Sequence, residues 1–278
     1  MRQGGDVDRR GPSLQYTADR TVLAGAVVCL SLARAGGAQV LETETARLRV
    51  QGAVQAGTNI EVQTSSEGRE WAVPMLFEYG ITNRWELVVE PVARTWIRPR
   101  ATPRAAGIGD TEITLEYLAR LESSTWPAIA VAGEVKAPTA RNTLIGTGQP
   151  DLAAYFIASK RFGNLDTHVN LTYTWVGQPP GAALSNIWGT AVAAMYAPAR
   201  RVRIYGEVLT TTSATGQPEQ TSALNVPVPV VAEAATQELV GTLGAGLYVR
   251  PRWFLSVGIS YDDTGAWLIR PGITFRSK

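Results

Sequence analysis

Alternating side chains in residues 107–136 constrain the fold of this chain more than any other stretch. In the first half, apolar residues hold the odd positions from Ile113 to Leu121, and mostly polar residues hold the even positions from Glu112 to Glu122. This two-residue period is that of a β-strand with one apolar face, whereas a helix would mix the two sets. The alternation resumes at Pro127, after the polar residues 122–125. The stretch therefore predicts a long antiparallel hairpin.

The same period recurs along most of the chain. Predicted strands cover residues 47–63, 70–79, 85–94, 112–122, 127–136, 151–158, 168–175, 186–197, 202–209, 237–249, 253–261 and 267–275. The connections tend to alternate in length: short near Thr82, Ser123, Gly163, Ala199 and Pro251, longer near Pro103, Asn142, Pro179 and Gln220, with short exceptions near Ser66 and Asp263. This alternation favours an all-β fold, a closed antiparallel up-and-down transmembrane β-barrel of about 12 strands, with the short turns in the periplasm.

Aromatic residues support lipid as the surroundings of the apolar faces. They cluster at the strand ends, as Trp71, Tyr79, Trp85, Trp126, Tyr173, Trp175, Trp253, Tyr261, Trp267 and Phe275. Amphipathic rings favour the headgroup level of a bilayer, so this placement suits two interfacial girdles. The alternative is a secreted soluble β-barrel binding protein, but strands of ten residues or more exceed the usual length of about five or six.

The first 38 residues have the features of a signal peptide. Basic residues precede an apolar run at 22–33, and small residues at 35–38 follow it, so we expect cleavage after Ala38. Residues 39–278 would then form the barrel, exported to the bacterial outer membrane. Cleavage would remove Cys29, the single cysteine, together with five Arg and three Asp. The remainder has equal numbers of basic and acidic residues, which argues against a nucleic-acid partner.

Charged and polar residues on the parity opposite the apolar rows predict the lining of an enclosed aqueous lumen. They are Glu78, Glu86, Glu90, Arg94, Glu112, Glu116, Arg120, Glu134, Lys136, His168, Asn170, Arg203, Glu207 and Arg270. A mid-strand Arg facing lipid at the bilayer centre would cost about 2–4 kcal/mol, which is why the arginines are assigned to the lumen. Such a lining either pairs across the interior and closes it or surrounds a narrow pore.

Short motifs in the mature chain resemble those of the MetA-pathway of phenol degradation family of outer-membrane proteins. They are Gly107-Ile-Gly-Asp110 opening a strand, Pro127 starting the next, Ala137-Pro-Thr139 closing it, Gly146-Thr-Gly148 with Asp151, and Phe162-Gly163. The resemblance covers most of residues 39–278, although Ala140 stands where a Gly often follows Pro-Thr, and Arg276-Ser-Lys278 extends past the terminal aromatic Phe275. It implies an outer-membrane role, with passage of hydrophobic or aromatic compounds.

The function predicted from these observations is a channel or transporter for small solutes, including hydrophobic or aromatic ones. The alternative within the membrane is a structural protein that transports nothing. Expected partners are outer-membrane lipid, lipopolysaccharide and the barrel-assembly machinery. A second hypothesis concerns residues 225–231, an apolar stretch in the longest loop, which would fold inward as a plug or catch an apolar solute.

Enzymatic chemistry has little support in the sequence. His168 is the only histidine, and no Ser lies two residues from it, so we interpret it as a hydrogen-bonding residue of the lumen. Asp262-Asp263-Thr264-Gly265 is ordinary hairpin chemistry and predicts no metal site. There is no phosphate loop or dinucleotide fingerprint. We therefore expect no catalytic residues, metal or cofactor.

Overall fold

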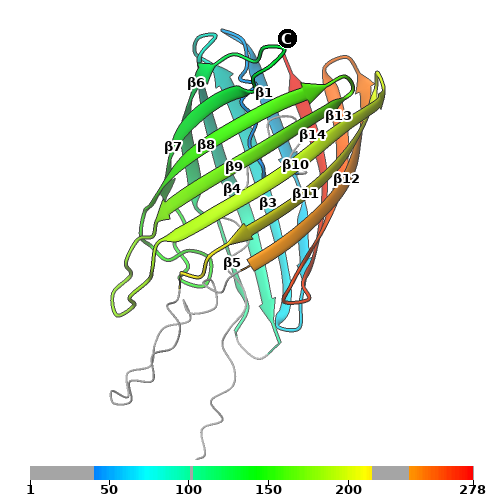
Figure 1. The fold of residues 1–278 in the computed structure, drawn as a ribbon. Helices are drawn as coiled ribbons and strands as arrows, with labels where there is room; N and C mark the ends of the chain where they lie inside the picture. Colours follow the sequence, from blue (N-terminus) through cyan, green and yellow to red (C-terminus); the bar gives the residue numbers. More distant parts are fainter. Residues whose placement is uncertain (1–40, 101–102, 215–237, 278) are drawn as a thin grey trace, which may run out of the picture.

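A single closed β-barrel forms the fold in the computed structural model, which describes residues 41–100, 103–214 and 238–277 (Figure 1). Its elements are β1 Val54–Asn59, β2 Glu61–Thr64, β3 Gly68–Gly80, β4 Trp85–Pro99, β5 Ala105–Gly107, β6 Thr111–Arg120, β7 Ala128–Ala137, β8 Asp151–Phe162, β9 Leu165–Trp175, β10 Ile187–Ala199, β11 Val202–Thr211, β12 Glu238–Arg250, β13 Trp253–Asp262 and β14 Trp267–Arg276. All neighbours pair antiparallel. No helix in these ranges is long and apolar enough to cross a membrane.

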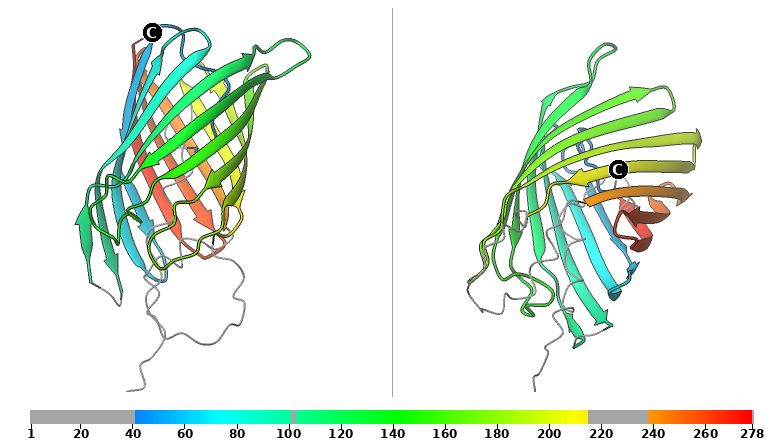
Figure 2. Two further views of the ribbon diagram at one scale, coloured as in Figure 1. Left: turned by 90° about the vertical axis from the view of Figure 1, so that its left-hand side faces the viewer. Right: turned by 60° about the horizontal axis from the view of Figure 1, so that its bottom comes forward.

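These elements make up twelve strands of wall, as predicted. β1 and β2 both pair with β3 and β14, so they are two parts of one strand interrupted at Ile60. β5 and β6 both pair with β4 and likewise occupy one place in the wall. The pairing of β1 and β2 with β14 closes the sheet on itself. Viewed from one end, the strands surround a lumen, and a coil at the start of the described chain lies inside it (Figure 2).

Two predicted boundaries were wrong in ways that matter for the lumen. The first strand was expected over residues 47–63, but β1 begins only at Val54, and residues 41–53 form no strand. The longer connection expected near Pro103 is short, because β4 continues to Pro99 and β5 begins at Ala105. The predicted signal peptide, the plug hypothesis for residues 225–231 and the cleavage site all lie outside the described residues.

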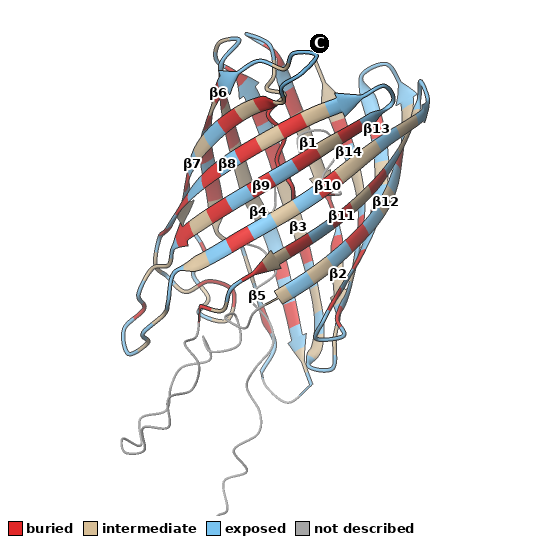
Figure 3. Ribbon diagram, in the orientation of Figure 1, coloured by how far each residue is buried: buried red, intermediate tan, exposed pale blue. Residues whose placement is uncertain are grey.

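The outward face of the barrel is apolar and exposed. Along β13, for example, Trp253, Leu255, Val257, Ile259 and Tyr261 are each 40–48% exposed, and the intervening side chains point inward. A soluble protein would bury such rows, because each fully buried aliphatic side chain stabilises the fold by about 1.5–3 kcal/mol. Figure 3 shows exposed and buried residues alternating along the strands. Rows of this kind do not suit a secreted soluble barrel, and they match the apolar band that faces lipid in outer-membrane barrels.

Two β-bulges change the facing of two residues that the sequence assigned to the lumen. In β4 the register with β3 shifts between Val73 and Pro74, so Ala93 is an extra residue and Arg94 turns outward. In β6 the register with β7 shifts between Leu118 and Arg120, which turns Arg120 outward. Both guanidinium groups then lie over exposed tryptophan rings, Arg94 at 5.6 Å from Trp96 and Arg120 at 4.7 Å from Trp126. One extra residue reverses the facing of every later side chain in a strand.

The end of the chain helps to close the barrel. Beyond Phe275, the Arg276 guanidinium donates to Gln55 Oε1 at 2.6 Å and to Tyr248 Oη at 2.6 Å, so it links β14 to β1 and β12. Ser277 N donates to Val54 O, and Val54 N donates to Ser277 Oγ at 2.8 Å. Arg276 and Ser277, which extend past the terminal aromatic residue, therefore continue the pairing of the first and last strands.

Candidate channel lumen

The structure places twelve of the fourteen predicted lumen residues on inward positions; the exceptions are Arg94 and Arg120. Buried among them are Glu78, Glu86, Glu112, Glu116, Glu134, His168, Asn170, Glu207 and Arg270. Glu90, Lys136 and Arg203 are partly exposed on the same inward parity. In stretches without a bulge the residues of this parity face inward, and the parity by itself does not say what those residues contact.

Residues 41–53, which we name the lumen segment, run inside the barrel from Leu41 to Arg49 and reach the rim at residues 50–52, which are exposed. The inner part of the segment occupies much of this lining. The segment passes the inner faces of β14, β11, β9 and β8 before it reaches β3 and β4 and enters β1. Residues from Leu41 to Ala46 are mostly buried, with Ala46 2% and Thr43 2% exposed. Since extended backbone inside a barrel has no strand partner, its polar groups need another source of hydrogen bonds.

Wall side chains supply those hydrogen bonds. The Glu207 carboxylate accepts from Glu42 N at 3.1 Å, from Thr43 N at 2.6 Å and from Thr43 Oγ1 at 2.6 Å. Asn170 Oδ1 accepts from Glu44 N at 2.5 Å, while Asn170 Nδ2 donates to Glu44 O at 3.2 Å. This pair of bonds mimics a rung of a β-ladder, and it shows how a polar wall can bind a peptide backbone without adding a strand.

Ala46, near the middle of the segment, and Arg49, toward its end, also bind side chains of the wall. Ala46 N donates to Ser159 Oγ at 2.9 Å on β8. Arg49 N donates to Glu86 Oε2 at 2.7 Å, and the Arg49 guanidinium forms an ion pair with Glu78, Nε to Oε2 at 3.0 Å. Bonds to charged groups contribute about 1.5–3 kcal/mol each, and more is lost when one partner is left buried and unpaired. Glu78 and Glu86, two of the residues predicted to line a pore, bind the lumen segment at Arg49.

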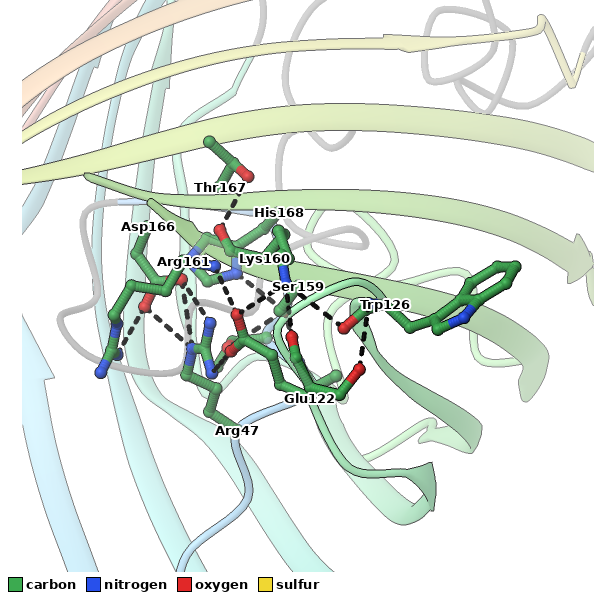
Figure 4. Close-up of polar contacts among 12 residues, drawn as sticks. Arg47, Glu122, Trp126, Ser159, Lys160, Arg161, Asp166, Thr167 and His168 are labelled. Atoms are coloured by element: carbon green, nitrogen blue, oxygen red, sulfur yellow. Dashed lines mark hydrogen bonds and ion pairs between the residues drawn. The ribbon is translucent and has the colours of Figure 1, made fainter. Parts of the chain in front are cut away.

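A charge network anchors the segment near the short turns (Figure 4). Arg47 Nη1 pairs with Glu122 Oε2 at 2.5 Å, and Arg47 Nε and Nη2 donate to the two oxygens of Asp166 at 2.9 and 2.8 Å. Arg161 Nη2 donates to Asp166 Oδ2 at 2.7 Å. Burial raises the pKa of Glu122, but hydrogen bonds from Arg161 N and the Arg47 guanidinium outweigh it and hold the pKa below its usual value. The bidentate geometry gives Arg47 a defined orientation.

At the other end of the segment, Glu42 forms an ion pair with Arg270. Arg270 is 2% exposed and also donates to Ser260 Oγ at 2.9 Å. On the long-loop side of Glu42, a pocket lined by Glu238, Asp262 and Arg270 has a volume of about 40 Å³. A single water needs roughly 10–15 Å³ of such volume, so the pocket has room for a few waters.

Inward charges outside the reach of the segment are bonded within the wall. Lys136 forms an ion pair with Asp151, and Asp151 Oδ1 accepts from Gly177 N at 2.7 Å. Glu134 Oε2 accepts from Thr114 Oγ1 at 2.9 Å and from the Tyr155 hydroxyl at 3.2 Å. Asp151 was one of the residues carrying the family resemblance, and its role here is to tie the start of β8 to β7 and to a long loop.

Three other motifs of the resemblance, 107–110, 137–139 and 146–148, meet at the same rim, whereas Pro127 and Phe162-Gly163 lie at the opposite rim. Asp110 Oδ1 accepts from Ala140 N at 2.9 Å, and Thr139 Oγ1 donates to Gly109 O at 2.8 Å. A Cβ at Gly146 would lie 2.8 Å from Asp110 Oδ2, and one at Gly109 would lie 2.6 Å from Val92 Cβ. Two glycines of the motifs are therefore required by close approach, which packs the 138–150 loop against the wall.

One part of the lumen wall is apolar. Tyr205 and Phe254 are 3% and 1% exposed, and they pack with Ala193 and with Leu41 of the lumen segment. A Cβ at Gly246 would lie 2.0 Å from the Phe254 ring, so only glycine leaves space for that ring. Met195 and Tyr248 pack at the edge of the cluster. If Leu41 moved away, the cluster would present aromatic surface to the lumen.

His168 is hydrogen-bonded to a serine on the neighbouring strand. Ser159 Oγ on β8 lies 2.9 Å from His168 Nδ1 on β9. Ser159 is 1% exposed, and its oxygen already accepts from Ala46 N. A nucleophile needs access to substrate as well as a base, and the lumen segment covers this oxygen. The pair is a structural contact in this arrangement. In the described part of the chain, no three His, Cys, Asp or Glu side chains are grouped to hold a metal ion.

Sequence reasoning missed the lumen segment because it extended the first strand back to residue 47. The signal that could have revealed it is the composition of residues 42–49, which alternates acidic and hydroxyl side chains and then adds two arginines, with no apolar row that lipid could cover. Such residues need a polar environment, and the lumen provides one.

Comparisons with known proteins find similar folds. No family model matches the sequence, and no curated protein matches it. Among solved structures, the COG4313 outer membrane channel from Pseudomonas putida F1 has a TM-score of 0.65 at 11% identity, over 83% of this chain and 97% of that one. The NanC porin has a TM-score of 0.56 at 10% identity, over 79% and 98% of the two chains. The KdgM porin, solved in complex with disordered oligogalacturonate, has a TM-score of 0.53 at 10% identity, over 80% and 98%. At these identities the likeness concerns the fold.

Proposed function

We propose that this chain is an outer-membrane channel for small solutes, in which the lumen segment must move before a solute can pass. The observation that carries the proposal is that wall side chains bind the segment's backbone at Thr43, Glu44 and Ala46 across the width of the barrel. The fold shared with outer-membrane channels and porins supports it. Export by the leader and insertion by the barrel-assembly machinery belong to the same proposal.

The contacts of the segment suit a movable element. Within the described part of the chain, residues 41–51 have no backbone hydrogen bonds to a strand, and most of their partners are side chains that water or ions can solvate once the segment leaves. Gly52 and Ala53 are bonded through their backbones to Gly80 of β3, so this end of the segment is fixed. A locally stable unit of this kind opens at a free energy below that of the whole fold. The barrel wall keeps its own backbone pairing in both states, so movement of the segment leaves the fold intact.

We extend the proposal to the class of solute. Withdrawal of Leu41 would expose the aromatic cluster of Tyr205 and Phe254 inside a lumen that also carries many charged side chains. A second apolar cluster, around Leu118 and Ile157, lies on the inner faces of β6, β7 and β8 beside the charged residues. Aromatic and apolar surface next to charged groups favours small molecules with an apolar or aromatic body. The resemblance to the MetA-pathway of phenol degradation family points to the same class.

A reversible crosslink tests the need for movement. Thr45 Oγ1 and Ser159 Oγ lie 3.4 Å apart, so the double substitution Thr45→Cys and Ser159→Cys would place two thiols within reach of a disulfide. We expect liposomes that contain the oxidised variant to take up phenol or small aromatic acids at the background rate, and uptake to return on reduction. The single variant Thr45→Cys is the control for the chemical treatment. Equal uptake in the oxidised and reduced states would refute the proposal.

A further inference from the structure

Three of the basic residues on the outward face of the barrel lie close together, whereas Arg120 lies at the opposite rim. The outward positions of the described strands carry no carboxylate, and three arginines, Arg69, Arg94 and Arg98, lie together on the paired strands β3 and β4. All three side chains are exposed. They lie toward the long-loop rim, where β4 extends well beyond the first residue of β6, Thr111, and Figure 1 shows this extension of the wall.

Two of these arginines face each other directly. Arg69 and Arg98 are register partners across β3 and β4. Their Cβ atoms are therefore about 4.5–5.5 Å apart on one face of the sheet, and like charges at that separation destabilise the pairing. Within the described residues, neither side chain has an ion pair or hydrogen bond that would offset the repulsion, whereas Arg47, Arg49 and Arg270 in the lumen are all paired with carboxylates.

Aromatic partners fix the level of these arginines in the membrane. Trp71 and Trp96 are the adjacent register pair, 45% and 39% exposed, and they mark the outer girdle of the apolar band. Arg69 and Arg98 lie two residues farther from the bilayer centre, a rise of about 6.6 Å. This is the headgroup level. Arg94 lies two residues closer to the centre, and its guanidinium reaches back over Trp96.

We propose that Arg69 and Arg98, assisted by Arg94, form a binding site for the phosphate groups of lipid A in the outer leaflet. A phosphate monoester accepts bidentate hydrogen bonds from guanidinium groups and neutralises the charge of a facing pair. Trp71 and Trp96 would contact the sugar and upper acyl region beside it. The proposal is independent of the function assigned to the lumen, because no contact of the lumen segment reaches this outer face.

The surroundings of the site are consistent with an anionic ligand. Arg100 and Arg104 are exposed just beyond β4, next to the same rim. One exposed carboxylate is near: Glu67, whose backbone oxygen accepts from Arg100 N at 2.9 Å and whose side chain bonds to Ser66 Oγ at 3.2 Å. Basic residues therefore outnumber acidic ones around the facing pair, which favours phosphate at the membrane surface.

Binding of lipid A to the purified, folded barrel in detergent tests the site. We expect the double variant Arg69→Gln and Arg98→Gln to lower the affinity for bisphosphorylated lipid A about tenfold or more, because two charge-assisted contacts are lost. Arg69→Lys with Arg98→Lys should retain part of the affinity. The matched control is Arg200→Gln with Arg201→Gln, two exposed arginines in the turn at the opposite rim. A heat-modifiable gel shift checks that each variant is folded.

The ligand arms distinguish lipid A from other anions. Dephosphorylated lipid A and phosphatidylglycerol should bind more weakly than bisphosphorylated lipid A, and millimolar inorganic phosphate should not displace it. Unchanged affinity in the Gln double variant, an equal loss in the Arg200 and Arg201 control, equal binding of phosphatidylglycerol, or displacement by free phosphate would each overturn the proposal.

Discussion

Arginine side chains have opposite surroundings in the lumen and on the outer face of β3 and β4. Inside, Arg47 and Arg49 of the lumen segment are bound by carboxylates of the chain itself, at Asp166, Glu122 and Glu78. Outside, Arg69 and Arg98 face each other with no described partner. An arginine paired with carboxylates of the chain helps to hold the lumen segment in place. An arginine without such a partner at the headgroup level instead indicates a ligand from the membrane.

The largest expected effect comes from removing the filling of the lumen. Deletion of residues 42–49 takes away the segment's backbone and both arginines, while every strand of the wall keeps its partners. We expect single-channel conductance in planar bilayers to rise several-fold over the intact chain, because the space filled by side chains becomes water. Conductance equal to that of the intact chain would mean that the segment does not limit the pore. It would also contradict the view that the arginines of the lumen help to close it.

Removing one wall partner should loosen the segment without removing it. Glu207→Ala deletes the acceptor of three hydrogen bonds from Glu42 and Thr43, each contributing about 1.5–3 kcal/mol because the acceptor is charged. We expect faster hydrogen exchange at Thr43 N and more frequent open events in bilayer recordings. Glu207→Gln keeps one carbonyl acceptor, so its exchange rate at Thr43 N should lie between those of the wild type and Glu207→Ala. Exchange at Thr43 as slow as in the wild type would argue against binding of the segment by this wall.

Overpacking the apolar side of the lumen should reduce stability more modestly. Gly246→Ala places a methyl group about where the Phe254 ring lies, so the ring must move. Such overpacking typically costs about 1–3 kcal/mol, which we expect as a lower unfolding midpoint in denaturant. Phe254→Leu in the same chain should restore part of the loss. An undiminished midpoint for Gly246→Ala would show that the cluster around Leu41 is loosely packed.

The smallest effect is expected from the two arginines that the bulges turn outward. Arg94→Gln and Arg120→Gln should leave ion selectivity unchanged, because neither side chain reaches the lumen. Arg270→Gln should shift the reversal potential toward cations, because it removes a buried positive charge beside Glu42. A similar shift for Arg94→Gln would place that residue back in the lumen and contradict the bulge in β4.

How far the sequence reached can be judged from particular elements. The alternation of Ile113, Leu115 and Tyr117 against Glu112 and Glu116 predicted both faces of β6 correctly up to Leu118. The prediction failed at Arg120 and at Arg94, because the alternation of the sequence does not reveal a β-bulge. An arginine after a bulge has the same spacing from its neighbours as a lumen arginine, and only the pairing with the next strand distinguishes the two.

The barrel could be predicted from the sequence alone, because long strands with one apolar row and aromatic residues at their ends fit a closed wall with lipid on one side and polar groups on the other. What the polar rows contact depends on the folded arrangement of the strands. Glu207, Asn170 and Ser159 are far apart in the chain from residues 42–46, and closing the barrel is what brings them to that backbone. Contacts across a lumen join residues more than a hundred positions apart, and no local pattern encodes such contacts.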